Sequence, residues 1–233
     1  QLSQRRKMDA LGTLVGGLAH ELGTPLNSIL LLADAAAVEP PEPARKKLQL
    51  IGSQARRCGD LVALLLGYSS GTAASQSREI RWEELIQSCF AAVKGDASVA
   101  LFTEVAPGIE TAVVPELAIR QILENLLRNA VQATQGRPQA GVRVQVELDR
   151  DTDEYEISVQ DNGPGFSEEA RERAFEAFFT TKGPLRQGTG LGLYVVYHMV
   201  HQIGGRISIS DAMEQGAKIV VRVPADDSKR PDR

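Results

Sequence analysis

The sequence predicts an α+β protein, in which a helical hairpin is followed by a domain of helices on one face of a mixed β-sheet. In the first 70 residues, apolar side chains recur in alternating steps of three and four, the spacing of a helix–helix seam. Further on, helical patterns at 82–93 and 115–134 stand beside alternating segments that are typical of half-buried strands, and helices covering one face of a mixed sheet fit this order. The strands are expected at 142–148, 155–159, 206–209 and 218–223.

The hairpin is expected to have a first helix from near residue 1 to about Val38 and a second helix after three prolines at 40, 41 and 43, which no helix can continue through. The seam of the first helix is formed by Met8, Leu11, Val15, Leu18, Leu22, Pro25, Ile29 and Leu32. The seam of the second helix is formed by Leu48, Ile51, Ala55, Cys58, Val62, Leu65 and Ser69. Two helices bury too little surface alone, so a four-helix bundle in a homodimer is predicted, with an intramolecular coiled-coil hairpin as the alternative.

Four parts of the chain are expected: the hairpin at 1–70, a small polar linker at 71–77, the second domain at 78–226 and a charged, frayed tail at 227–233. The net charge of −4 among 233 residues gives no electrostatic reason to bind nucleic acid or an anionic membrane. No apolar stretch approaches the roughly 20 residues of a membrane span. Two cysteines without a CxxC pair indicate neither a disulfide framework nor a zinc site, and favour a reducing cytoplasm. Because the chain begins in mid-helix, we expect it to be the cytoplasmic portion of a longer sensor.

A single histidine, His20, occupies the outward side of the first helix. An exposed neutral imidazole is a nucleophile, and the adjacent Glu21 can hold the proton of one ring nitrogen while the other nitrogen attacks. Thr24 follows one turn later, and Pro25 should kink the helix. By itself this segment could equally be a surface histidine before a kinking proline.

Four further motifs follow in order: Asn125–Ala130, Asp161–Phe166, Phe175–Lys182 and Gly188–Leu193. Together with His-Glu-x-x-Thr-Pro at His20, they resemble the H, N, G1, F and G2 boxes of the sensor histidine kinases of two-component systems, over roughly residues 5 to 224. The H-box wording is similar to that of RegB/PrrB-type redox-responsive kinases. The resemblance implies a GHKL-type ATP-binding α/β sandwich, Mg²⁺ and ATP as cofactors, phosphorylation of His20, transfer to an aspartate of a response regulator, and a phosphatase role for Thr24.

The asparagine pair Asn125 and Asn129 projects from one helix face, and an amide oxygen with phosphate oxygens suits Mg²⁺. The resemblance makes Asn129 the principal magnesium ligand. Related GHKL ATPases have a water-activating glutamate at the position of Asn125, and an amide cannot take that proton, which favours transfer over hydrolysis. Glu124 points about 100° away on the helix. The alternative is a pair of asparagines on a solvated helix.

Glycine-rich turns supply the other candidate nucleotide contacts. Asp161 ends a strand, and the resemblance assigns it to the adenine amino group; glycines after it let the backbone approach a ligand. The run from Gly188 to Gly192 leads into a helix whose first N–H groups can hold phosphate. A tight turn and a glycine hinge are the alternatives. The residues involved are Gly163, Gly165, Gly188, Thr189, Gly190, Leu191 and Gly192.

Between the two glycine motifs, phenylalanines that can anchor and Gly183-Pro184 that can flex suggest a lid over the nucleotide, with Thr181 and Lys182 near its phosphates. The family often has proline at Ala177 and lysine at Gln132. Arg128 either supplies the missing phosphate-facing charge or is a solvated helix residue.

Three further features of the sequence have alternative interpretations. Cys58 either packs as a small hydrophobe in the seam or is a redox-active thiol activated by Arg56 and Arg57. His198 and His201 are taken as surface or core histidines rather than metal ligands. The rival functions are a GHKL ATPase or protein serine kinase, and a degenerate kinase that serves as a dimeric scaffold.

Overall fold

The computed structural model describes residues 22–23, 26–36, 40, 43–45, 47–48, 50–52, 54–55, 58, 76–95, 97–177, 179–181, 190–211 and 216–225. These residues fall into two compact units, one at 22–58 and the other at 76–225. The first unit holds part of the predicted hairpin, and the second holds the predicted sheet and its helices.

In the first unit, residues 26–36 are helical, and helical residues recur from 43 to 58 after Pro40. This agrees with two helices on either side of the prolines. Several large apolar side chains are exposed in the single copy, among them Leu30 at 61% and Leu31 at 70%. Within the described ranges, no helix combines the length and the apolar character that crossing a bilayer requires.

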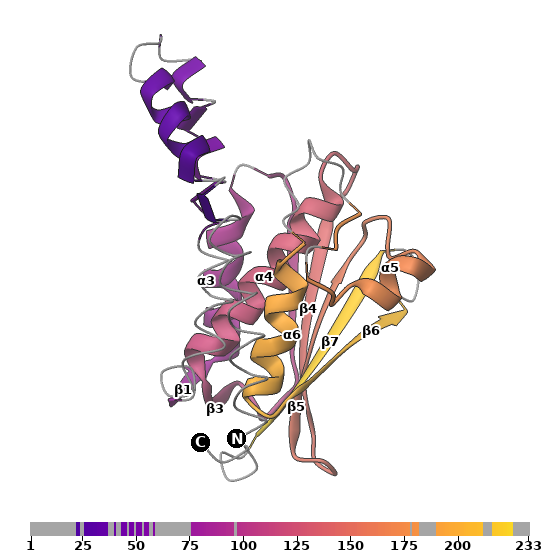
Figure 1. Ribbon diagram of the computed structural model, residues 1–233. Coiled ribbons are helices and arrows are strands. Elements are labelled where there is room, and N and C mark those ends of the chain that lie inside the picture. The colour runs from indigo at the N-terminus through magenta and orange to yellow at the C-terminus, as the bar shows by residue number, and fades with distance from the viewer. Residues whose placement is uncertain are drawn as a thin grey trace, which may run out of the picture. The chain divides into compact units, whose positions relative to one another are not determined.

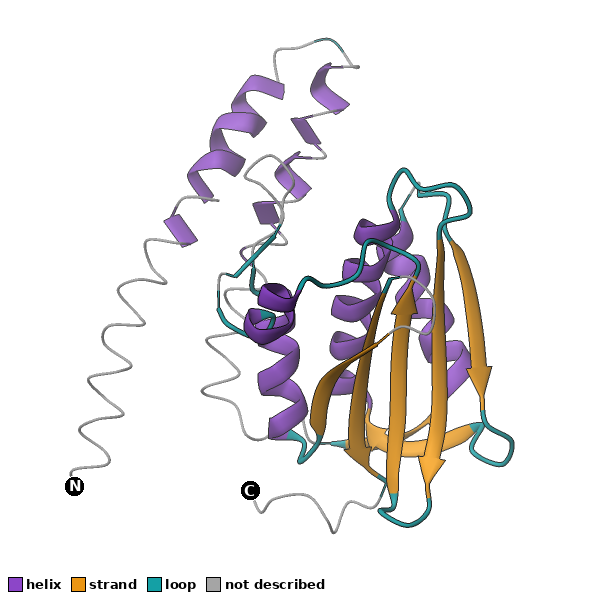
Figure 2. Ribbon diagram, turned by 90° about the vertical axis from the view of Figure 1, so that its right-hand side faces the viewer, coloured by secondary structure: helices purple, strands orange, loops and turns teal. Residues whose placement is uncertain are grey.

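The second unit contains a five-stranded mixed sheet in the order β2-β4-β5-β7-β6. Strands β2 and β4 are parallel, and the other neighbours are antiparallel. Three long helices, α3, α4 and α6, lie on one face of this sheet (Figures 1 and 2). Their bounds are Trp82–Lys94, Glu116–Thr134 and Gly192–Gln202. The strands are β2 (Ala100–Val105), β4 (Gly141–Asp149), β5 (Glu154–Asp161), β6 (Arg206–Asp211) and β7 (Ala217–Pro224).

Two smaller features complete the second unit. Strands β1 (Ser77–Arg81) and β3 (Thr111–Pro115) pair as an antiparallel ribbon. A six-residue helix, α5 (Glu168–Arg173), begins at Ser167, whose hydroxyl accepts a hydrogen bond from the Ala170 N–H at 3.2 Å.

The alternation of side chains in the strands determines which face of the sheet is buried. In β4, Val142, Val144 and Val146 are fully buried, while Arg143 and Glu147 on the other face are exposed and Gln145 is half-buried. Val144 and Val146 pair with the buried Val159 and Ile157 of β5, so these parts of the two strands present one continuous apolar face.

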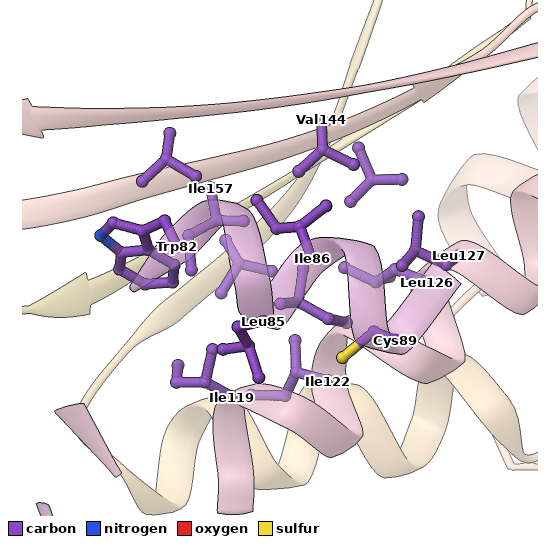
Figure 3. Close-up of a cluster of buried hydrophobic side chains, with 14 of the residues drawn as sticks. Trp82, Leu85, Ile86, Cys89, Ile119, Ile122, Leu126, Leu127, Val144 and Ile157 are labelled. Carbon is purple, nitrogen blue, oxygen red and sulfur yellow. The ribbon is translucent and has the colours of Figure 1, made fainter. Parts of the chain in front are cut away.

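The core lies between this face and the helices. Figure 3 shows these side chains on one side of the strands that carry Val144 and Ile157: Trp82, Ile86 and Cys89 of α3 and Ile119 and Ile122 of α4 belong to a single apolar cluster. Full burial of a side chain of this size contributes about 1.5–3 kcal/mol. The contact is therefore strong enough to fix the rotation of α4, and with it the direction of its remaining side chains.

The predicted helices and strands of this unit are confirmed to within one or two residues at most of their ends. Strands β1, β2 and β3 and helix α5 were not predicted. In β2, apolar residues occupy both faces, because Phe102 is 53% exposed while Leu101 packs on the core, so no alternation marks the strand. Strand β1 begins at Ser77, the last residue of the predicted linker.

We expect Cys89 to be unreactive in the folded protein. Burial raises the pKa of its thiol to about 11, and its Sγ lies 3.8 Å from the carbonyl oxygen of Arg120. In a Cys58→Ser variant, a disulfide reagent at pH 8 should label no thiol in native protein and one thiol after denaturation, because only about one part in a thousand of Cys89 is thiolate at that pH. Fast labelling of the native variant would show that Cys89 is not a core residue.

Candidate functional site

The flank of α4 that is not packed on the core carries Asn125 and Asn129, and the first residue of α6 lies against both. A Cβ atom placed on Gly192 would be 3.7 Å from Asn125 Oδ1, 3.7 Å from Asn129 Nδ2 and 3.8 Å from Asn129 Oδ1. The N and G2 motifs, separated by more than sixty residues of sequence, therefore meet at one point. The side chain of Asn125 is oriented by its Nδ2, which donates to the Gln121 carbonyl at 3.0 Å.

The amino end of α6 provides the hydrogen-bond donors of this point. Leu191 is almost fully buried, and its carbonyl accepts the Val195 N–H at 2.8 Å as the helix begins. Gly190 has φ of +65°, a conformation that glycine adopts without strain. The first N–H groups of a helix have no partner within the helix and lie at the positive end of its dipole. The amino end of α6 is therefore suited to binding an anion.

Glu124 precedes Asn125 by one residue on α4, which places the two side chains about 100° apart around the helix. Burial raises the pKa of the Cys89 thiol on α3, and the negative charge of Glu124 raises it further, so this carboxylate lies near Cys89. The expectation that Glu124 points away from Asn125 stays a prediction. Among the described residues, no cluster of three or more His, Cys, Asp or Glu side chains is present that could hold a metal ion.

Asp161, at the end of β5, is 8% exposed, and two backbone donors orient its carboxylate. Its Oδ1 accepts the N–H of Gly163 at 2.7 Å and that of Ala217 at 3.3 Å. Gly163 has no room for a side chain, because a Cβ there would lie 2.6 Å from the same oxygen and 3.0 Å from the Cβ of Ala133 on α4. The turn after β5 is therefore packed directly against α4.

Two further glycines, Gly165 and Gly216, allow the start of β7 to lie against this turn. Gly216, with φ of +109°, lies so close to Asp161 that a Cβ would overlap the Asp161 carbonyl oxygen. A Cβ on Gly165, whose φ is +78°, would lie 2.8 Å from the Gly216 carbonyl oxygen. The role of Gly216 was not predicted, because it stands outside the glycine-rich motifs.

Asn162 is a further residue that was missed. Its Oδ1 accepts the Gly141 N–H at 3.0 Å, and its Nδ2 donates to the Gln139 carbonyl at 2.8 Å. It thereby joins the turn after β5 to the loop before β4. Asn is common in turns for this hydrogen-bonding ability, and the Asp-Asn-Gly sequence was the signal that could have indicated it.

The phenylalanine segment is partly described. Phe175 lies against Tyr197 of α6, with ring centroids 5.6 Å apart, and the Arg173 guanidinium lies 4.4 Å from the centroid of the Phe179 ring. Thr181, the last described residue before the gap, is exposed. Lys182, Gly188 and Thr189 lie outside the described residues, as do His20, Glu21 and Thr24, so their predicted roles stay predictions.

Arg128 follows Asn125 by three positions, which places it about 60° around α4 on the side away from Asn129. It is half-buried, and its Nε is shielded from solvent without a hydrogen-bond partner. No phosphate-facing direction follows from these facts. On α6, His198 and His201 are exposed; the pKa of His198 is lowered, first by partial burial of the ring and then by the neighbouring His201.

We expect Gly216→Ala to destabilise the second unit severely, by about 2 kcal/mol or more, because the methyl group would collide with backbone at Asp161. Gly108→Ala is the matched control: Gly108 also has positive φ, +86°, but open space around it, so backbone strain alone should cost about 1 kcal/mol. Urea unfolding followed by the fluorescence of Trp82, the single tryptophan of the chain, measures both. Equal losses would contradict the close approach at Gly216.

Comparison with known proteins gives two family matches. Residues 10–74 match the His Kinase A (phospho-acceptor) domain, and residues 115–227 match the histidine kinase-, DNA gyrase B- and HSP90-like ATPase family. The first match contains His20, and the second contains Asn125, Asn129, Asp161 and the glycines around them. Together the matches span most of the chain.

Individual proteins agree with these families. The C4-dicarboxylate transport sensor protein DctB of Pseudomonas aeruginosa is 32% identical over 226 residues, which are 94% of this chain and 36% of that protein. The sensor histidine kinase ZraS of Escherichia coli O157:H7 is 32% identical over 238 residues, 99% of this chain and 50% of that protein. The crystal structure of full-length ShkA in complex with AMPPNP superimposes with a TM-score of 0.66 at 27% identity, over 91% of this chain and 45% of that one.

The chain thus spans half or less of the length of these relatives. The phospho-acceptor match precedes the ATPase match along this chain, and the described part has a mixed sheet, with asparagine and glycine motifs that converge. The chain belongs to the sensor histidine kinases of two-component systems, with a phospho-acceptor domain followed by a GHKL-type ATP-binding domain.

Proposed function

We propose that this chain binds ATP with Mg²⁺ on its second unit, transfers the γ-phosphoryl group to His20, and passes it to an aspartate of a response regulator. The observation that carries this proposal is the meeting of Asn125, Asn129 and the amino end of α6 at Gly192. It brings amide oxygens and helix N–H groups to one place, in a chain whose other domain matches a phospho-acceptor family.

Each part of this place has a role in holding the nucleotide. The N–H groups at the start of α6 donate hydrogen bonds to phosphate oxygens. The buried carboxylate of Asp161 accepts a hydrogen bond from the adenine amino group. Neutral amide oxygens fit Mg²⁺, a hard cation that takes oxygen ligands and keeps several waters when phosphates share it. Asn129 would hold the ion, which would neutralise charge on the phosphates. The AMPPNP complex of ShkA supports nucleotide binding by this fold.

The chemistry favours transfer to histidine over hydrolysis. Asn125 offers an amide where a general base would have to stand, and Glu124 is about 100° away around the helix, near Cys89 of α3. Water beside the γ-phosphate would therefore find no carboxylate on this flank of α4. The unprotonated ring nitrogen of His20 would attack phosphorus with its lone pair, the bond from phosphorus to the β-phosphate oxygen would break, and ADP would leave, while Glu21 holds the proton on the other ring nitrogen.

Dimerisation of the first unit is part of the proposal. Leu26, Leu30, Leu31 and Leu48 are each more than half exposed in the single copy, which is unfavourable for apolar side chains on a helix in water. A four-helix bundle formed by two hairpins would cover such side chains. We also propose that this portion works in the cytoplasm, where ATP and response regulators are found.

The test of the function is the fate of labelled phosphate. Incubation with γ-labelled ATP and Mg²⁺ should give a protein-bound label that is acid-labile and base-stable, and His20→Gln should abolish it without changing nucleotide affinity, because the acceptor and the nucleotide are held by different units. Acid-stable label would indicate a serine or threonine kinase. Nucleotide binding without any label, with the dimer retained, would indicate a scaffold.

Asn129→Asp should lower the initial rate of labelling by about tenfold or more, equivalent to about 1.4 kcal/mol, because a carboxylate beside the phosphates adds repulsion and changes the metal ligand. Glu124→Gln is the control on the same helix and should stay within twofold of the unmodified protein, since Glu124 is about 100° around the helix from Asn125 and near Cys89 of α3. Rates are measured at saturating and subsaturating Mg-ATP. Loss of activity in Glu124→Gln, with Asn129→Asp unaffected, would reverse the assignment.

A further inference from the structure

We propose that Tyr197 is a positioning residue for nucleotide binding: its ring holds Phe175, and through Phe175 it places the segment that ends at Thr180 and Thr181 beside the amino end of α6. This inference rests on the proposed binding of ATP. It adds a residue that lies outside all five motifs.

The contact that carries the inference joins two stretches on either side of the 182–189 gap. The ring centroids of Phe175 and Tyr197 are 5.6 Å apart, with the ring planes inclined by 36°. Tyr197 follows Gly192 by five residues, which is about 7.5 Å along the helix axis. Phe175 is therefore attached to α6 within one and a half turns of the end that meets Asn125 and Asn129.

The segment that Phe175 belongs to is tied together internally. The Arg173 guanidinium pairs with Glu169 at 3.1 Å and with Glu176 at 3.0 Å, and it also covers the ring of Phe179. Backbone hydrogen bonds run from the Glu176 N–H to the Arg173 carbonyl and from the Phe179 N–H to the Glu176 carbonyl. Arg173, Glu176 and Phe179 are thus tied to one another, so fixing Phe175 on α6 constrains the two threonines that follow.

Tyr197 is not needed for the core. On α6, Val196 and Val200 are fully buried in the main cluster of apolar side chains, whereas Tyr197 is only half-buried and does not belong to that cluster. Its ring also lies 4.3 Å, centroid to centroid, from that of His201, which is exposed. Removal of the Tyr197 ring should therefore disturb the phenylalanine segment far more than the packing of α6 on the sheet.

The experiment compares Tyr197→Leu, Tyr197→Phe and His201→Ala in the whole chain. Tyr197→Leu should raise both the ATP KM for labelling and the dissociation constant of ADP by about three- to tenfold, the range expected for loss of an aromatic pair. The labelling rate at saturating ATP should fall by less than twofold. Tyr197→Phe, which keeps the ring, should have the affinity of the unmodified protein, and His201→Ala, which removes one of the two histidine rings that contact Tyr197, should leave the affinity within twofold.

A double variant guards against a general loss of structure. In a Phe175→Leu background, Tyr197→Leu should cause no further loss of affinity, because the partner ring is already absent. Additive losses, or an equal loss in His201→Ala, would overturn the inference. Unchanged affinity in Tyr197→Leu would also overturn it, while leaving the proposed function intact. Failure of the unmodified protein to bind ADP at all would instead refute the proposed function.

Discussion

Everything in the candidate site depends on how helix α4 is packed. One side of the helix is buried against α3 and the sheet through side chains such as Ile119, Ile122 and Leu126, which fixes its rotation to within the tolerance of a close-packed core. Because the rotation of α4 is fixed, the directions of its other side chains are fixed too. Asn125 and Asn129 face the start of α6, Glu124 lies near Cys89 of α3, and Ala133 meets the turn after β5. If the core allowed α4 to rotate, side chains other than the two amides would face the start of α6.

The second constraint is backbone proximity around Asp161. A carboxylate that is 8% exposed needs donors, and it receives them from Gly163, two residues later, and from Ala217, fifty-six residues later. The backbone that carries these donors passes so close to Asp161 that a side chain fits neither at position 163 nor at position 216, and both are glycine. The adenine-facing carboxylate that we propose is thus oriented by the fold of the sheet rather than by its own rotamer preferences. This explains why a glycine distant in sequence belongs to the site.

These two constraints also explain what could be predicted from the sequence. Periodicity reports burial, so α3, α4 and the valine-rich strands were predictable, and the asparagine spacing placed both amides on one face of α4. Strand β2 was not predicted because Phe102 is apolar yet exposed, and α5 was not predicted because six residues are too few to establish a period. Gly216, Asn162 and Tyr197 were missed for a different reason. Their roles come from contacts made across the fold, with Asp161, Gly141 and Phe175, and such contacts leave no local pattern.

The amide at Asn125 has a consequence for signalling in the proposed function. A nucleotide held by amide groups and helix N–H donors would be polarised, but an amide at Asn125 cannot take the proton of an attacking water. ATP could then remain bound without being hydrolysed until a better nucleophile arrives. In the proposed function that nucleophile is His20, which belongs to the other unit. The step under control would therefore be the approach of the histidine rather than the binding of ATP, so a signal that acts on the hairpin could start phosphorylation without any change in the nucleotide site.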